Sequence, residues 1–325
     1  MKFVSLIQTL SQIQQNLSVQ RNFLHNNIMP LLDAARENND GSLEASDFRK
    51  ITDYYGLAVP AILAESFCVL HGRKLTEKER WTATCQGAMT GLFDDFFDKN
   101  FLDNEAILLK TIRKTEAVEK KQNEKLFEVF YDNAIQHIHD RQKMTEALKD
   151  VYEAQLESKK QTNNLSPAEI EYITLSKGGY SLLFYRTAVN EKLSVAENEM
   201  LFHAGGLMQL CNDIFDVYKD RENKIFTLAT TCQNIRELKN EFRQQLAIVQ
   251  LKIGQLPFAR KNKERFFNMI DLAVFSRTEV CLQQLMKVQR KNGGFNLPRL
   301  SRVELICDMD NAKNKIRSTV YFLRH

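Results

Sequence analysis

Three carboxylates are crowded into five residues of this chain, within the segment TGLFDDFFDKNF at residues 90–101. Asp94, Asp95 and Asp98 are interleaved there with phenylalanines, which a solvated surface rarely requires. Successive helical residues are about 100° apart, so Asp94 and Asp98 lie about 40° apart on one face. Like charges at this spacing repel, and a hard cation such as Mg²⁺ removes that cost. An isolated DDxxD string also fits the frayed end of a surface helix. The choice between a metal site and a surface helix end therefore depends on other residues of the chain.

A second set of polar side chains recurs at helical spacing in MQLCNDIFDVYKDRENK, residues 208–224. Asn212, Asp216 and Asp220 are spaced i, i+4, i+8, and their directions fall within about 80° of one another. Both clusters lie near expected helix C-termini, where the helix dipole disfavours acids unless a cation is present. We therefore predict that the two clusters converge on one group of metal ions.

At these residues the chain resembles the class I isoprenoid synthase superfamily, which includes terpene cyclases, trans-prenyltransferases and squalene/phytoene-type synthases. DDFFD is similar to the first DDxxD motif of that family. NDIFDVYKD is similar to the NDxxSxxKE motif of terpene cyclases, with Asn212, Asp213, Lys219 and Asp220 in step. Asp216 stands where Ser or Thr is usual, which makes this motif a hybrid with the second aspartate motif of prenyltransferases. The resemblance covers roughly residues 60 to 225.

The resemblance implies a Mg²⁺-dependent terpene cyclase that ionises an allylic isoprenoid diphosphate and releases diphosphate, with three Mg²⁺ ions. Prenyl transfer or squalene/phytoene-type head-to-head condensation is the enzymatic alternative, and a non-catalytic helical scaffold is the second alternative. Chain-elongating prenyltransferases usually carry an Arg-Arg pair after the first motif, where this chain has KNFLDNEA. Elongation is therefore the weaker choice.

The resemblance also implies roles for individual residues. The implied metal ligands are Asp94, Asp95, Asp98, Asn212, Asp213, Asp216 and Asp220, and all of them except Asp213 form the predicted catalytic set. The groups expected to bind diphosphate are Lys177, Arg186, Lys219, Arg221, Lys224, Arg317 and Tyr321. Arg221 and Lys224 fit equally well as solvated partners of a helix dipole.

The carbocation left by diphosphate departure needs a dry cavity with aromatic walls. The chain has 21 Phe and 9 Tyr, and aromatic side chains lie beside both motifs. The candidates for cavity lining are Phe93, Phe97, Tyr180, Phe184 and Phe215. For each of them taken alone, ordinary core packing is the better interpretation.

Composition and length favour an all-α protein. The 325 residues are 43% hydrophobic and 26% charged, and only 12 Gly and 5 Pro supply turns, too few for a sandwich or barrel. We expect a single-domain helical bundle of the isoprenoid synthase type with a central apolar cavity over residues 43–325. A helical extension, residues 1–42, precedes it and ends in the polar segment ENNDGS.

Local signals set the expected helix boundaries. Ser/Thr-x-x-Glu capping boxes predict helix starts at Thr76, Ser166, Ser194 and Ser301, and the first helix should reach the DDFFD cluster. Residues 116–160 form one long charged amphipathic stretch. The pairs Gly178-Gly179 and Gly205-Gly206 indicate either close helix packing or local breaks that line a cavity.

Several partner classes are disfavoured. The net charge is only +4 with basic residues spread along the chain, so no nucleic acid is implied. Six cysteines without a CxxC pair argue against a disulfide framework or a zinc site and favour reduced thiols in the cytoplasm. No apolar window reaches the ~18 residues that a membrane span needs, and the opening residues do not read as a signal peptide. Peripheral membrane association and a homodimer are compatible with the sequence.

Overall fold

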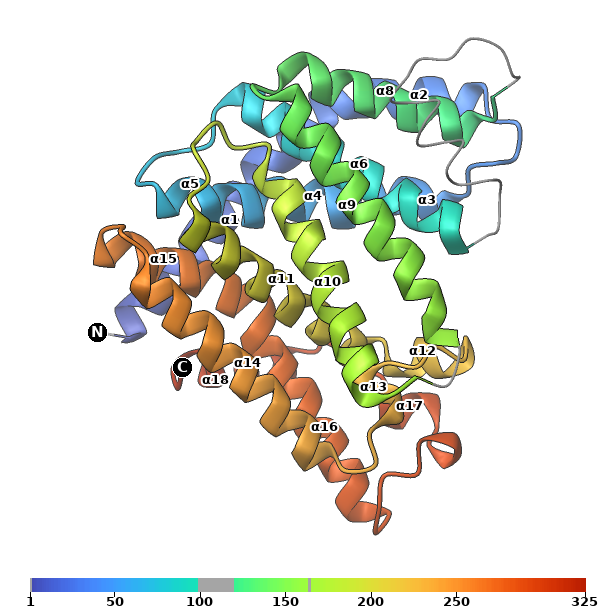
Figure 1. Ribbon diagram of the computed structural model, residues 1–325, viewed down its shortest axis with the longest axis vertical. Helices are drawn as coiled ribbons and strands as arrows, with labels where there is room; N and C mark the ends of the chain where they lie inside the picture. Colours follow the sequence, from blue (N-terminus) through green and yellow to red (C-terminus); the bar gives the residue numbers. More distant parts are fainter. Residues whose placement is uncertain (1, 99–119, 163–164) are drawn as a thin grey trace. The chain divides into compact units, whose positions relative to one another are not determined.

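The computed structural model describes residues 2–98, 120–162 and 165–325, without the side chains of residues 94–98. All secondary structure in these residues is helical, which confirms the all-α class (Figure 1). The chain divides into two compact units. Unit 1 comprises Met1–Thr9, Lys149–Leu183 and Lys192–His325, and unit 2 comprises Leu10–Leu148 and Phe184–Glu191. The boundary at residue 42, the isoprenoid synthase type of bundle and its central cavity stay predictions.

Unit 2 is built around α6, which packs against α4 and α8. Pro30 lies in the first turn of α2, where its missing N–H leaves no helical bond unmade. The helices with residues in this unit are α1 (Lys2–Phe23) from Leu10, α2 (Met29–Glu37), α3 (Ala45–Arg49), α4 (Tyr55–Ala58), α5 (Glu65–Leu70), α6 (Glu77–Asp98), α8 (Gln122–His137), α9 (Arg141–Ser158) up to Leu148, and the end of α10 (Pro167–Arg186) from Phe184.

The helical stretch Ala45–Leu70 is long and apolar enough to cross a membrane by length and composition alone. However, 67% of its most apolar window is buried inside the fold, and Ile51, Ala61 and Phe67 are fully buried. This burial is typical of a core helix, so the described residues hold no clear membrane-spanning segment.

Helix α6 begins at its predicted capping box. The backbone N–H and the hydroxyl of Thr76 donate to Glu79 Oε2 at 2.9 and 2.8 Å, and the Glu79 N–H returns a bond to the Thr76 hydroxyl at 3.4 Å. Arg73 pairs with the same carboxylate at 2.5 Å, and the Asn190 N–H donates to it at 2.7 Å. The helix then continues to Asp98, as predicted.

The stretch predicted over residues 116–160 is not one helix. Within its described part, α8 ends at His137 and α9 begins at Arg141. Ile138 has extended backbone angles, and Asp140 Oδ1 accepts the Lys143 N–H at 3.0 Å. The side chain of Asp140 therefore starts a new helix, although the apolar periodicity runs on through the break.

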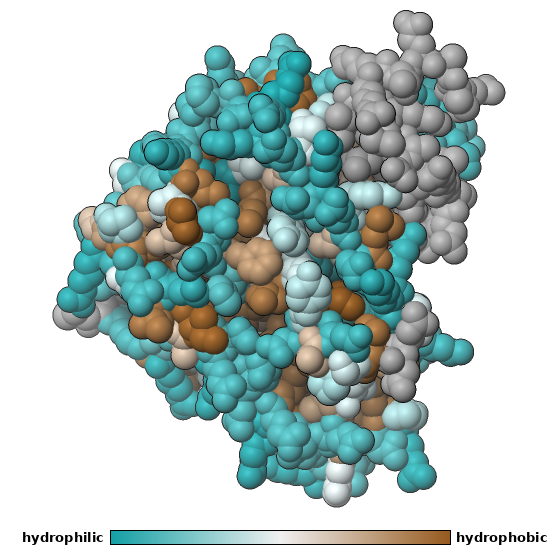
Figure 2. All heavy atoms as spheres, viewed as in Figure 1, coloured by the Kyte–Doolittle hydropathy of each residue, from teal (hydrophilic) through white to brown (hydrophobic). Residues whose placement is uncertain are grey.

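Unit 1 is built around α11, which packs against α14 and α16. Its core includes the fully buried Phe242, Phe266 and Leu282. On the face of the whole chain drawn in Figure 2, hydrophilic residues predominate, with hydrophobic residues among them. The helices with residues in this unit are α1 up to Thr9, α9 from Lys149, α10 up to Leu183, α11 (Val195–Phe215), α12 (Val217–Glu222), α13 (Leu228–Thr231), α14 (Ile235–Gln255), α15 (Arg260–Ile270), α16 (Ser276–Lys291), α17 (Arg302–Leu305) and α18 (Ala312–Phe322).

The other three predicted caps are present. The box at Ser166 is reciprocal, and the Ser194 hydroxyl accepts the Glu197 N–H at 3.2 Å. The box at Ser301 is also reciprocal, but it starts only the four-residue helix α17. Asn311 caps the last helix, because its side chain accepts the Lys313 N–H at 2.9 Å.

The two glycine pairs serve close packing. Helices α10 and α11 run without interruption through Gly178-Gly179 and Gly205-Gly206, so the alternative of local breaks is wrong. A Cβ added to Gly178 would lie 2.1 Å from the carbonyl oxygen of Gly205, and one added to Gly205 would lie 2.2 Å from that of Gly178. Only glycine lets these two backbones touch.

Candidate functional site

The second acidic cluster lies where α11 passes into α12. Asp216 stands between the two helices, and its N–H donates to the Asn212 carbonyl at 2.8 Å. The Asp220 N–H donates to the Asp216 carbonyl, also at 2.8 Å. Because both i, i+4 bonds are kept across the junction, Asn212, Asp216 and Asp220 stay on one face. We call these three residues the acidic face.

Burial and mutual repulsion perturb the carboxylates of the acidic face. Burial, followed by repulsion from Asp213 and Asp216, raises the pKa of Asp220 to about 7. Burial also raises the pKa of Asp216, against attraction from Lys219 and a hydrogen bond from the Asn212 amide, 3.5 Å from Asp216 Oδ2. Such crowded carboxylates are stabilised by any nearby positive charge.

Asp213 has a different environment from its neighbours. Its side chain is 4% exposed, and its two oxygens accept bonds from Gln209 Nε2 at 2.8 Å and from the Thr174 hydroxyl at 3.2 Å. Burial raises the pKa of Asp213 to about 6, although both hydrogen bonds and the charge of Lys177 oppose the rise. Since Thr174 lies on α10, Asp213 ties α10 to α11. Thr174 could not be found from the sequence, because a threonine within a helix has no distinguishing pattern.

Lys177, on α10, carries a positive charge that acts on this cluster. It lies three residues after Thr174, and its positive charge lowers the pKa of Asp213, Asp216 and Asp220 alike. Lys219, on α12, exerts the same attraction on Asp216 and Asp220. The local structure of unit 1 therefore places two predicted diphosphate-binding lysines near the acidic face.

The acidic face supplies hard oxygen ligands. No three His, Cys, Asp or Glu side chains gather into a metal-binding group in residues 2–93, 120–162 and 165–325. One amide and two carboxylates remain on the acidic face, since the carboxylate of Asp213 is already occupied by two donors. This donor set fits Mg²⁺, which takes one or two protein carboxylates and completes its coordination with water and phosphate oxygens.

The first acidic motif occupies the last turn of α6 in unit 2. The backbone of Asp94, Asp95 and Asp98 is helical, as predicted, but their side chains and that of Phe97 lie outside the described residues. Their roles stay predictions. Phe93, just before them, is buried and stacks on Phe127 with ring centroids 6.0 Å apart.

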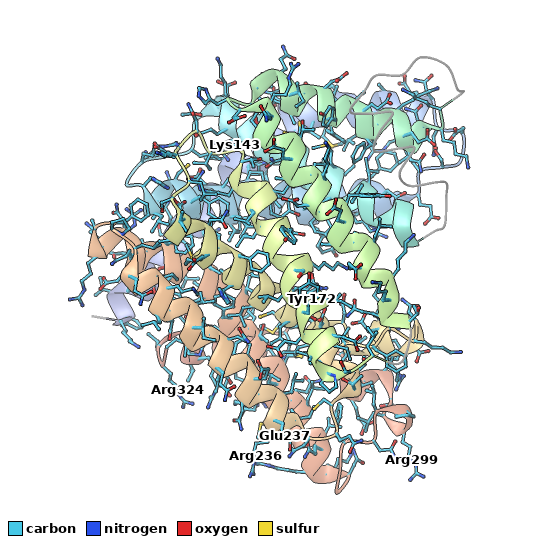
Figure 3. The ribbon with its side chains drawn as sticks, in the orientation of Figure 1. Lys143, Tyr172, Arg236, Glu237, Arg299 and Arg324 are labelled. Carbon is cyan, nitrogen blue, oxygen red and sulfur yellow. The ribbon has the colours of Figure 1, made fainter. Side chains whose placement is uncertain are left out.

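Two predicted diphosphate ligands have structural partners instead. Arg186 is 2% exposed and donates to the carbonyls of Val189 and Glu191 at 3.0 and 3.3 Å. Arg221 donates to the carbonyls of Leu297 and Leu300 at 3.0 and 2.5 Å and so holds the loop that carries Arg299 (Figure 3). A guanidinium occupied in this way is poorly placed to bind a substrate, so we leave both out of the proposed site.

The remaining basic and phenolic candidates lie on α18 or just after α12. Lys224 is exposed and has a left-handed φ of 56°. Arg317 contacts Asn314 at 3.4 Å, and the Tyr321 hydroxyl donates to Gln283 at 2.5 Å. None of the contacts described for Arg317 or Tyr321 reaches the acidic face, so their assignment stays a prediction.

The remaining aromatic candidates make pairs typical of packing. The Tyr180 ring meets Phe202 edge-on at 5.2 Å, and Phe184 contacts Tyr185 at 5.8 Å. Phe215 is half-buried at the end of α11. These contacts agree with the core-packing interpretation of each ring, and a cavity lined by them stays a prediction.

Comparison with known proteins adds no assignment. No family model, curated protein or solved structure matches this chain. Each of the six cysteines is free, in agreement with the sequence prediction. A functional assignment therefore rests on the two motifs and on the local chemistry of unit 1.

Proposed function

We propose that this chain is a Mg²⁺-dependent class I isoprenoid synthase, a terpene cyclase that ionises an allylic isoprenoid diphosphate. The observation that carries the proposal is the electrostatic attraction between Lys177 and the crowded carboxylates of Asp216 and Asp220. In a metal-bound diphosphate the metal ion is positive and the diphosphate is negative. The carboxylates can therefore bind the metal ion while the lysine binds the diphosphate oxygens.

In this proposal each group of the acidic face has a defined role. Asn212, Asp216 and Asp220 hold Mg²⁺ through oxygen atoms, and Asp213 positions α10 rather than binding metal. Lys177 and Lys219 bind the diphosphate oxygens. Bound Mg²⁺ would stabilise the negative charge that builds on the leaving diphosphate.

The first motif enters the proposal from the sequence. Asp94, Asp95 and Asp98 are expected to bind Mg²⁺ as well, and the resemblance implies three ions in all. The apolar residues beside both motifs would exclude water from the carbocation. The missing Arg-Arg pair after DDFFD favours a cyclase over a chain-elongating enzyme.

Turnover of defined substrates tests the proposal. The purified chain is incubated with Mg²⁺ and with geranyl, farnesyl or geranylgeranyl diphosphate, and release of inorganic diphosphate and the organic products are measured. We expect diphosphate release with at least one substrate and a hydrocarbon or alcohol product of unchanged carbon number. No release from any substrate would favour the scaffold alternative. A longer product when isopentenyl diphosphate is added would favour prenyl transfer, and a product with twice the carbon number would favour head-to-head condensation.

Variants of the acidic clusters separate chemistry from folding. Asn212→Ala and Asp94→Ala should abolish turnover with little loss of stability, because loss of one ligand does not unpack the core. Glu222→Gln is the matched control, since Glu222 is an exposed acid of α12 paired with Arg221 at 2.9 Å. If Asn212→Ala unfolds the protein while activity per folded molecule survives, the cluster is structural.

A further inference from the structure

The first turns of α1 expose large apolar side chains. Phe3, Val4 and Ile7 are 66%, 57% and 54% exposed, whereas Leu6 and Thr9 on the other side of the helix are buried. A single exposed apolar residue is ordinary, but three within five residues of one helix form a contiguous apolar surface. These residues belong to unit 1.

Helix α15 of the same unit lies against this part of α1. Asn268 Nδ2 donates to the Ser5 hydroxyl at 2.8 Å, and Figure 1 shows α15 beside the start of the chain. The first turns of α15 are strongly basic, with the sequence RKNKER at residues 260–265. We call the exposed residues of these two segments, 2–9 and 260–265, the α1/α15 surface.

The charge on the α1/α15 surface has one dominant sign. Residues 2–9 contain Lys2 and no acid, and residues 260–265 contain four basic residues and one acid, Glu264. Glu264 is paired with Arg260 at 2.7 Å, and Lys263 donates to two carbonyls at the end of α14. Lys261 and Arg265 are exposed. The α1/α15 surface therefore combines exposed apolar side chains with a net positive charge.

We propose that the α1/α15 surface docks on an anionic lipid bilayer. Apolar side chains that enter the interface and basic groups that meet anionic headgroups are the two components of such binding. A second copy of the chain is the less favoured occupant, because a symmetric contact would bring the same basic residues together. Nucleic acid would leave Phe3, Val4 and Ile7 without a role. The proposal is independent of the proposed enzymatic function.

Vesicle flotation tests the docking. The full chain is mixed with vesicles of phosphatidylcholine alone or with added phosphatidylglycerol, and the bound fraction is measured at low and high salt. We expect binding to the anionic vesicles that weakens with salt, because screening reduces the attraction of the basic residues. The proposal would be overturned if the chain bound neither kind of vesicle, or if it bound the neutral and the anionic vesicles equally.

Surface variants locate the contact. Phe3→Ser/Ile7→Ser should weaken partitioning at least about tenfold. Lys261→Glu/Arg265→Glu should weaken it by about 25-fold or more, at about fivefold per basic residue. The matched controls are Val195→Ser/Val303→Ser and Lys313→Glu, which change exposed residues elsewhere in unit 1 and should bind as the parent does.

Two results would contradict the proposal even if the parent binds vesicles. One is unchanged vesicle binding by both α1/α15 variants when circular dichroism shows them folded. The other is a Phe3→Ser/Ile7→Ser variant whose mass differs from that of the parent but whose vesicle binding does not. The mass is measured by size-exclusion chromatography with light scattering. The second result would identify the surface as a contact between copies of this chain.

Discussion

Gly178 and Gly205 hold the backbones of α10 and α11 in contact directly beside Lys177. A Cβ on Gly178 would meet not only the Gly205 carbonyl oxygen at 2.1 Å but also Cβ of Gln209 at 2.7 Å. Gln209 is itself a hydrogen-bond donor to Asp213. The contact between Gly178 and Gly205 thus brings the two helices close together and also places Lys177 near the acidic face.

Gly178→Ala should destabilise the protein by at least about 2 kcal/mol, because a backbone carbonyl cannot move aside as a side chain can. Urea denaturation measures the change. Gly254→Ala is the control: nothing lies within 4 Å of a Cβ at Gly254 in α14, so alanine there should be neutral or stabilising by up to about 1 kcal/mol. Equal effects of the two substitutions would contradict the close packing of α10 and α11.

Thr174→Val should lower the free energy of unfolding by about 1–3 kcal/mol, because the buried carboxylate of Asp213 loses one of its two donors without a change of side-chain shape. The pKa of Asp213 should rise further, since a hydrogen bond that favours the charged form is lost. Thr319→Val is the control, because its exposed hydroxyl donates only to the Ile316 carbonyl of its own helix. If the Thr174 variant is as stable as the parent, the hydrogen bond from Thr174 to Asp213 does not stabilise the packing of α10 on α11.

Glu79 makes stability depend on pH in the acid range. Burial raises its pKa, but hydrogen bonds from Arg73, Thr76 and Asn190 outweigh it and lower the pKa to about 2. The ordinary glutamate value, 4.5, applies to the unfolded chain, so folding favours the ionised form. This contribution is fully present above about pH 5 and is lost as the pH falls towards 2.

Glu79→Gln should therefore cost about 1–3 kcal/mol at pH 7, and the difference from the parent should shrink as the pH is lowered from 5 to about 2. Thermal unfolding across that range measures it. Glu77→Gln, in the same first turn of α6 but exposed, should change stability by less than about 0.5 kcal/mol at any pH. A pH-independent loss in Glu79→Gln would mean that its ion pair and caps do not act through charge.

The features that could be predicted from the sequence are local. The caps at Thr76 and Ser166 depend on residues three apart, so the pattern and the structure agree. The spacing of Asn212, Asp216 and Asp220 is likewise a property of one continuous helical register, and it persists although the helix itself changes at Asp216.

What the sequence could not supply depends on tertiary contacts. Gly178 could mark a break or a close contact until its neighbour, 27 residues further on, was known. Arg186 has the charge of an anion ligand, but carbonyls brought close by the turn after α10 occupy it. Thr174 gains its role only from Asp213 across the helix pair. The break after α8 was missed because a single aspartate cap outweighs an apolar period that continues.

The most direct test of the central claim is calorimetric titration of the purified chain with inorganic diphosphate, with and without Mg²⁺. We predict binding that requires Mg²⁺, is lost in Asp216→Asn, is weakened at least about tenfold in Lys177→Gln, and is unchanged in Glu222→Gln and in the exposed control Lys287→Gln. Diphosphate binding that needs no Mg²⁺, or that survives unchanged in folded Asp216→Asn and Lys177→Gln, would contradict the assignment of the acidic face and Lys177 as a metal–diphosphate site.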